Sequence, residues 1–249
     1  MVKKAMRPAL LAVCVFLAGA STLEARPERL FGFKAGFNSG QLRATEDAGD
    51  YDVENFRVNG GSAGIAANFG LNRFLSFQPE LLFFVKGGKY RVGVPVGVPG
   101  IAINVTDTRS LTYLEIPMLL KATLPLKFAL KPTFLAGPSV GVNLGARLKN
   151  RIEIIVPGYQ FAWYNKEGIR DQVKDIELSL VVGGGFDIDL PKGKLVVDQR
   201  FFFGLSANNY QVTIPASDFQ AIGIPITEDI VYRLDMNNYV FAVSIGYLF

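Results

Sequence analysis

The residues best equipped for chemistry in this chain are charged residues that alternate with apolar neighbours, because the usual catalytic residues are scarce. The 249 residues include no histidine and a single cysteine, Cys14. This composition excludes a Ser-His-Asp triad, a Cys-His pair and histidine-containing zinc sites. Gly183-Gly184-Gly185 lies in an apolar, strand-like run, which favours close packing or a bulge over a phosphate-binding loop. We therefore expect no catalytic residues, no cofactor and no metal site.

Eight of the charged residues occupy the polar side of alternating runs, and the set mixes both signs. Isolated charges in a low-dielectric interior are costly, so opposite signs are expected to pair. The set therefore predicts a charge network that plugs the interior of a closed sheet. A narrow ion path and a ligand cavity are the alternatives. The residues are Lys34, Glu80, Glu115, Lys121, Asp187, Asp189, Asp198 and Arg200.

The elements that position these charges are strands, because apolar and polar residues alternate with a period of two across most of the chain. Mean hydropathy is +0.25, yet no apolar run is long enough for a membrane-spanning helix. Lipid cannot satisfy an open sheet edge, so we predict an all-β, eight-stranded antiparallel up-and-down transmembrane β-barrel. The predicted strands are residues 30–40, 61–71, 74–86, 111–124, 128–144, 176–190, 195–207 and 238–249.

The connections between these strands alternate in length. Short turns are predicted near 71–73, 125–127 and 191–194, and long loops near 41–60, 87–110, 147–175 and 208–237. This segregation is typical of outer-membrane barrels, whose short turns are periplasmic and whose long loops are extracellular. Four prolines interrupt predicted strands and remove ladder donors, so we expect bulges or register kinks there. They are Pro79, Pro117, Pro132 and Pro138.

The amino-terminal residues predict export. Lys3, Lys4 and Arg7 precede an apolar run of residues 9–19, and Ala18-Gly19-Ala20 forms a small-residue cleavage site. We predict a Sec signal peptide at 1–20, a short segment at 21–29 and a barrel domain at 30–249. Removal of the three cations lowers the formal net charge from +4 to +1, so basicity gives no support for nucleic-acid binding.

Several segments resemble the PorT-like outer-membrane β-barrel family. The resemblance covers about residues 30–249, and Tyr113-Leu114-Glu115-Ile116-Pro117 is its most specific part. It implies an eight-stranded barrel in the outer membrane of a Gram-negative bacterium, and it implies little about activity. It also implies that Tyr247 and Phe249 form the terminal signal that the barrel-assembly machinery recognises. Further matching segments are Phe31-Gly32-Phe33-Lys34-Ala35-Gly36, Phe77-Gln78-Pro79-Glu80-Leu81, Leu135-Ala136-Gly137-Pro138, Val182-Gly183-Gly184-Gly185-Phe186-Asp187 and Ile245-Gly246-Tyr247-Leu248-Phe249.

The functional hypothesis is a structural or interaction protein whose recognition, if it has any, uses the long extracellular loops. Those loops are rich in apolar residues, including Trp163, the only tryptophan. Either the strands extend and the loops pack on one another, or the loops form a partner surface. The expected partners are outer-membrane lipid, the assembly machinery and a protein bound by the loops. A soluble secreted lipocalin-like barrel that binds an apolar ligand, and a small-pore outer-membrane channel, are the alternatives.

Overall fold

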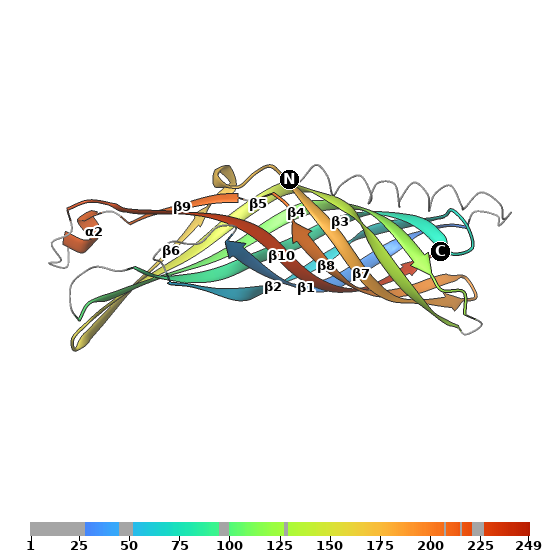
Figure 1. Cartoon of the computed structure of the whole chain (residues 1–249), viewed down its shortest axis with the longest axis horizontal. Coiled ribbons are helices and arrows are strands. Elements are labelled where there is room, and N and C mark those ends of the chain that lie inside the picture. Colours follow the sequence, from blue (N-terminus) through green and yellow to red (C-terminus); the bar gives the residue numbers. More distant parts are fainter. Residues whose placement is uncertain are drawn as a thin grey trace, which may run out of the picture.

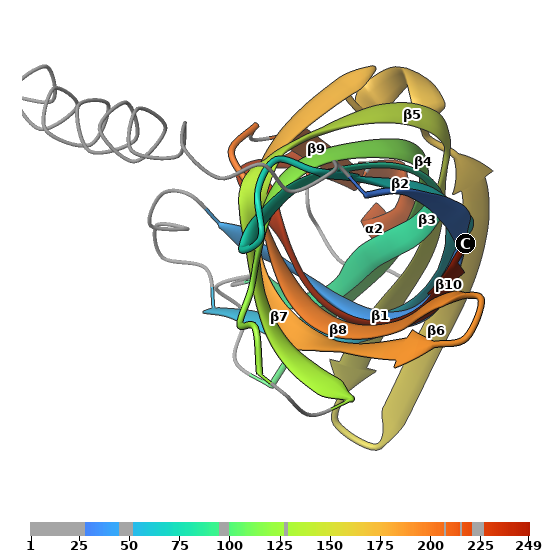
Figure 2. The ribbon, with the colours of Figure 1, turned by 90° about the vertical axis from the view of Figure 1, so that its right-hand side faces the viewer.

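Eight long strands form a closed ring, seen end-on in Figure 2. In this computed structural model the antiparallel neighbours follow in the order β1-β2-β3-β4-β5-β7-β8-β10, and β10 pairs back with β1. The predicted fold class is therefore confirmed. The bounds are β1 Arg29–Ala44, β2 Asp52–Gly70, β3 Leu75–Val94, β4 Ala102–Thr123, β5 Leu130–Val156, β7 Ile176–Leu190, β8 Gly193–Gly204 and β10 Ile230–Leu248.

The structure describes residues 28–44, 52–94, 100–126, 129–206, 208–214, 216–220 and 227–249. The predicted signal peptide at 1–20 lies outside the described residues, as does most of the predicted segment 21–29. No helix in the described ranges is both long enough and apolar enough to cross a membrane.

One end of the ring, the short-turn end, has compact connections. Between β2 and β3, the side-chain oxygen of Asn72 accepts hydrogen bonds from the backbone N–H groups of Phe74 and Leu75, both at 2.8 Å. Such local hydrogen bonds satisfy the backbone N–H groups of the turn, so a short turn is sufficient here. Between β7 and β8, Gly193 has a φ of +127°, which only glycine adopts readily.

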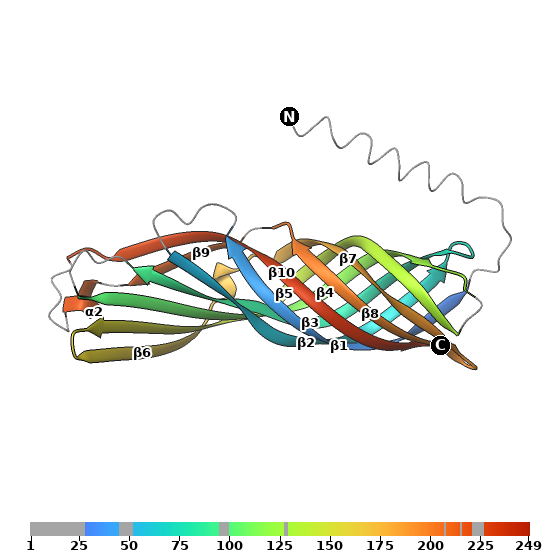
Figure 3. The same ribbon diagram turned by 60° about the horizontal axis from the view of Figure 1, so that its bottom comes forward.

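The opposite end, the long-loop end, differs from the sequence prediction. Much of each segment predicted as a long loop is in fact strand, because the flanking strands continue their pairing well past the apolar residues. The residues there are charged or polar, but their backbone remains extended. The sequence prediction read them as loop and therefore ended the strands too early. This end also carries β6 (Tyr159–Gly168), a 3₁₀ turn η2 (Arg170–Gln172), β9 (Asn208–Ile214) and α2 (Ala216–Gln220). Figures 1 and 3 show β6, β9 and α2 projecting away from the end that holds the C-terminus.

The prediction of bulges or kinks at the four prolines is wrong. The register on either side of Pro79, Pro117, Pro132 and Pro138 is unchanged, and the pairing skips a few residues beside Pro79, Pro117 and Pro138. A proline removes one N–H donor but fits an extended backbone, so the strand runs straight through. The register shifts in the described strands lie between Arg57 and Ser62 and between Thr112 and Tyr113.

The two faces of the ring have opposite chemistry. Large apolar side chains point outward on each of the eight strands of the ring; Phe33 is 66% exposed and Phe134 is 61% exposed. Inward positions are buried and include many charged residues. An exposed apolar surface that encircles a barrel exceeds what a soluble monomer normally carries. The outward set includes Phe31, Phe37, Ile65, Leu81, Phe83, Leu120, Leu178, Leu180, Phe186, Phe201, Ile245 and Tyr247.

Candidate functional site

The interior of the barrel is the candidate site, and its inward residues form layers along the strands. On β3 the inward order from the short-turn end is Ser76, Gln78, Glu80, Leu82, Phe84, Lys86, Gly88, Tyr90 and Val92. Polar layers therefore alternate with apolar ones. The middle apolar layer packs Leu82 and Phe84 against Leu119, Leu135, Val181, Phe202, Val240 and Ala242.

The first charged layer joins four residues from three strands, β1, β3 and β8. Lys34 Nζ lies 2.6 Å from Asp198 and 3.1 Å from Glu80, and the Arg200 guanidinium donates to both Glu80 oxygens at 2.6 and 2.7 Å. Arg200 also lies 2.7 Å from Asp198. Two cations and two carboxylates balance, and all four side chains are at least 97% buried. The fork of arginine matches a carboxylate in two parallel bonds, so this layer is geometrically fixed.

The second charged layer lies on the other side of the apolar layer and centres on Lys86. Its ammonium lies 2.5 Å from Glu115 and 2.8 Å from Glu177, and 4.2 Å from the centre of the Tyr113 ring. Ser139 donates to the second Glu115 oxygen at 2.7 Å, and Asn238 donates to the second Glu177 oxygen at 2.7 Å. These donors satisfy the carboxylate oxygens that Lys86 does not reach.

The remaining predicted charges lie toward the short-turn end. Lys121 pairs with Asp187 at 2.6 Å, and both are buried. Asp189 is exposed and pairs with Lys131 at the mouth, so the structure does not bring Asp189 into the buried layers. The sequence prediction thus grouped seven residues that lie buried together in the interior and one that lies outside it.

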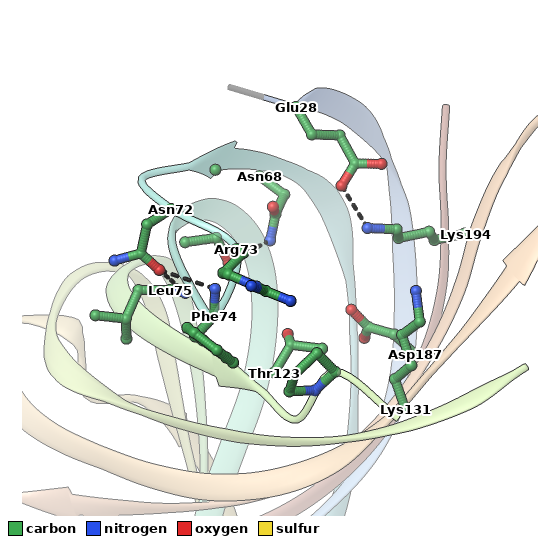
Figure 4. A pocket seen from close by; sticks show the side chains of 13 residues that line it. Glu28, Asn68, Asn72, Arg73, Phe74, Leu75, Thr123, Lys131, Asp187 and Lys194 are labelled. Atoms are coloured by element: carbon green, nitrogen blue, oxygen red, sulfur yellow. Dashed lines mark hydrogen bonds and ion pairs between the residues drawn. The ribbon is translucent and has the colours of Figure 1, made fainter. Parts of the chain in front are cut away.

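A cavity of about 230 Å³ opens at this mouth, and Figure 4 shows its lining. Glu28 and Lys194 form an ion pair on one side, and the Asn72 turn closes the other. Asn68 and Ser76 line the cavity, and Asn68 Nδ2 donates to Ser76 at 3.0 Å and to Gln78 at 3.3 Å. No group of three or more metal-ligating side chains occurs in the described part of the chain.

At the long-loop end, buried apolar side chains occupy the interior. Tyr90, Val92, Ile103, Leu111 and Met236 belong to one buried cluster that spans β3, β4 and β10. Within it, the carboxylate of Asp107 accepts hydrogen bonds from Tyr90 at 2.7 Å and Asn150 at 2.8 Å. Burial raises the pKa of Asp107, and the hydrogen bond from Tyr90 and the charge of Arg109 oppose that rise.

Two members of the buried layers, Lys86 and Glu177, were missing from the predicted set. Both stand on the inward side of their alternating runs, so the period-two signal was present. Both lie within predicted strands, at 74–86 and 176–190, on the polar side of the alternation. The predicted strands therefore included them, and only the predicted set of interior charges left them out.

The β5–β6 hairpin carries a strand, β6, that is exposed along its whole length. All ten residues of β6 are exposed, and β6 pairs with β5 alone among the described strands. Its side chains include Tyr159, Phe161, Trp163 and Tyr164, with the Phe161 and Trp163 rings stacked at 6.3 Å. This hairpin offers an aromatic surface and a row of backbone groups at a sheet edge.

The model of one protein family, the outer membrane protein beta-barrel domain, matches residues 23–209. The chain belongs to this family, and it is an outer-membrane β-barrel protein of the cell outer membrane. The alternative of a soluble lipocalin-like barrel is wrong, because the apolar face points outward and the interior is charged.

Solved structures of outer-membrane barrels are similar to the chain at low sequence identity. OprG from Pseudomonas aeruginosa is 11% identical, with a TM-score of 0.42 over 92% of this chain and 99% of that one. AlkL, solved in DMPC bilayers, is 12% identical, with a TM-score of 0.36 over 92% and 94%. The protease OmpT from Escherichia coli is 11% identical, with a TM-score of 0.32 over 92% and 100%. No curated protein matches the sequence.

Proposed function

We propose that this protein is a closed, non-conducting and non-enzymatic barrel with a structural or interaction role in the outer membrane. The observation that carries the proposal is the layered interior. Two charged layers and the Lys121–Asp187 pair alternate with apolar side chains from one end of the ring to the other. An eight-stranded barrel has an interior just wide enough for side chains to fill it, and here paired charges take that role.

Recognition in this proposal belongs to the long-loop end, facing the cell exterior. Support comes from the length pattern of the connections and from the exposed aromatic β5–β6 hairpin. Exposed aromatic residues in a rigid sheet are typical of protein contact surfaces. A partner protein would meet this hairpin, and outer-membrane lipid would meet the apolar band.

Biogenesis forms the second part of the proposal, with a Sec signal peptide at 1–20 and a PorT-like assignment within the family. Tyr247 and Phe249 would serve as the signal read by the assembly machinery. Phe249 exchanges backbone hydrogen bonds with Phe31 at 2.8 and 3.0 Å, where β10 meets β1. Its ring is 59% exposed and lies 6.5 Å from Phe33. Replacing Phe249 with serine should reduce the amount of folded barrel in the outer membrane, whereas unchanged amounts would contradict this role.

Single-cysteine labelling tests the closed interior. Cys14 is the only cysteine and belongs to the predicted signal peptide, so Ser139→Cys would give the mature chain one thiol beside Glu115. A charged, water-soluble thiol reagent should leave this position unlabelled in the folded barrel, because Ser139 is 1% exposed. Thr123→Cys, which lines the mouth cavity, is the matched control and should react readily. Equal labelling rates at the two positions would contradict a closed interior.

A further inference from the structure

The outer face of the extended hairpins is strongly basic. Beyond the apolar band, β3, β5 and β6 present six cations to the outside, and we call this set the basic face. Three of the six are exposed and three are partly exposed. The residues are Lys89, Arg91, Arg147, Lys149, Arg151 and Lys166.

The strand register lines these cations up across the sheet. Lys149 lies directly opposite Lys166 on β6, and through Thr108 of β4 the same row continues to Lys89 on β3. The next row joins Arg91, Thr106, Arg151 and Tyr164. Like charges directly opposite each other are destabilising in an antiparallel sheet. A bound anion would relieve this repulsion.

Few carboxylates offset the basic face. Among the outward side chains that the structure describes here, Glu54 lies 3.7 Å from Arg91, and Glu153 lies 2.6 Å from Arg151. Arg147, Lys149 and Lys166 have no ion pair with any described residue. Four cations therefore remain in excess.

The basic face begins where the apolar band ends. On β5 the outward residues change from Val142 and Leu144 to Arg147, and on β3 they change from Phe83 and Val85 to Lys89. Aromatic residues flank the cations, as they do at membrane interfaces. Lys89 lies 5.3 Å from the Phe56 ring centre, and Arg151 lies 5.3 Å from that of Tyr164. The cations therefore adjoin the apolar band on its long-loop side.

Among the side chains of β1 and β10 that the structure describes at the same end, beyond the apolar band, the charges are balanced. Arg43 of β1 stacks on the Tyr239 ring at 5.1 Å, and Asp235 of β10 provides an acid. Among the described residues the cation excess thus belongs to β3, β5 and β6, which argues against a general solubilising role.

We propose that the basic face binds the phosphate groups of a phosphorylated glycolipid of the outer leaflet, of which lipid A is the representative. Three features support this occupant: uncompensated cations, the hydroxyl of the partly exposed Thr108 between them, and an acyl-compatible apolar band directly below. Basic clusters beside a membrane-spanning segment are a common means of binding anionic headgroups. The inference needs the long-loop end to face outward, but it does not depend on a closed interior.

The test titrates lipid A, and the same lipid with both phosphates removed, into the detergent-solubilised mature barrel at physiological salt. Bound lipid is counted by native mass spectrometry. Wild-type protein should prefer the phosphorylated form, and Arg147→Gln/Lys149→Gln/Lys166→Gln should weaken its binding about tenfold or more. The rescue variant Lys149→Arg/Lys166→Arg should bind as the wild type does, because it keeps the charge. Gel mobility before and after heating verifies that each variant is folded.

A matched control removes three cations elsewhere, as Arg43→Gln/Lys174→Gln/Lys192→Gln, and should bind lipid A normally. Equal losses in the two triple variants would show a net-charge effect and overturn the proposal. Equal binding of the dephosphorylated lipid would also overturn it, as would competition by free phosphate or by heparin at concentrations comparable with lipid A. A conducting wild-type barrel would contradict the closed interior and leave this result unaffected.

Discussion

The interior and the basic face use the same residue types in opposite ways. Inside, Lys34 and Arg200 each contact two carboxylates within 3.1 Å. Outside, Lys149 and Lys166 face each other with no described acidic partner. Burial makes an unpaired charge very costly, so interior cations require carboxylates, whereas water tolerates the outer excess. The difference indicates that interior charges hold the barrel together and that outer charges are available for a ligand.

The largest expected effect comes from breaking the first charged layer. Glu80→Gln removes the carboxylate shared by Lys34 and Arg200, and it should lower the free energy of unfolding by about 3–5 kcal/mol. Denaturant unfolding of the barrel in phospholipid vesicles measures this. The control Asp189→Asn removes an exposed partner at the mouth and should cost no more than about 1 kcal/mol. Similar losses of unfolding free energy in both variants would contradict the claim that interior ion pairs matter more for stability than surface pairs.

The second charged layer should respond nearly as strongly and should show coupling. Lys86→Met leaves Glu115 and Glu177 buried without their shared cation, with an expected loss of about 3 kcal/mol. Adding Glu177→Gln to that variant should recover part of the loss, because one uncompensated carboxylate is then gone. A double-mutant cycle in the same unfolding assay measures the coupling, and strictly additive losses would show that the layer does not act as a unit.

A pH-dependent effect is expected at the long-loop end. Because burial raises the pKa of Asp107, the folded state holds that proton more tightly than the unfolded state does. The contribution of Asp107 to stability is then fully present below about pH 4 and is lost as the pH rises through the folded-state pKa. The difference in unfolding free energy between wild type and Asp107→Asn should follow this slope. The exposed Glu54→Gln control should not follow it, and a slope of opposite sign would show that Tyr90 and Arg109 outweigh burial.

The smallest expected effect is at the basic face. Arg147→Gln/Lys149→Gln/Lys166→Gln should change the unfolding free energy in zwitterionic lipid by no more than about 0.5 kcal/mol. Relief of repulsion between Lys149 and Lys166 could even stabilise the sheet. A loss of about 2 kcal/mol in unfolding free energy would mean that these cations stabilise the fold. It would contradict the contrast between stabilising interior charges and outer charges that are available for a ligand.

Much of the architecture was predictable because the two faces of each strand differ so clearly. Alternation in the sequence assigns Phe134 to the outside and Thr133 to the inside, and the structure places both there. It also selected seven of the charges that lie buried together. The choice of partners was not predictable, since Lys34 meets Asp198 across 164 residues of sequence. That pairing depends on the stagger of the strands around the ring.

The long-loop end was less predictable for a physical reason. Strand signals in the barrel come from apolar residues that face outward, and these stop near Leu144 on β5. Beyond that point β5 continues to Val156, held by cross-strand hydrogen bonds with β4 and β6. Backbone pairing of this kind leaves little trace in composition. The basic face became visible only once the register had placed Lys149 beside Lys166.

Single-channel conductance in planar lipid bilayers tests the central claim most directly. Purified wild-type barrel should insert without producing stable, reproducible channels, because paired charges and apolar layers fill its interior. A variant with Lys34, Glu80, Asp198 and Arg200 all replaced by serine should also stay closed, because the middle apolar layer and the second charged layer still fill the interior. Stable, uniform channels from the wild-type protein would contradict the account.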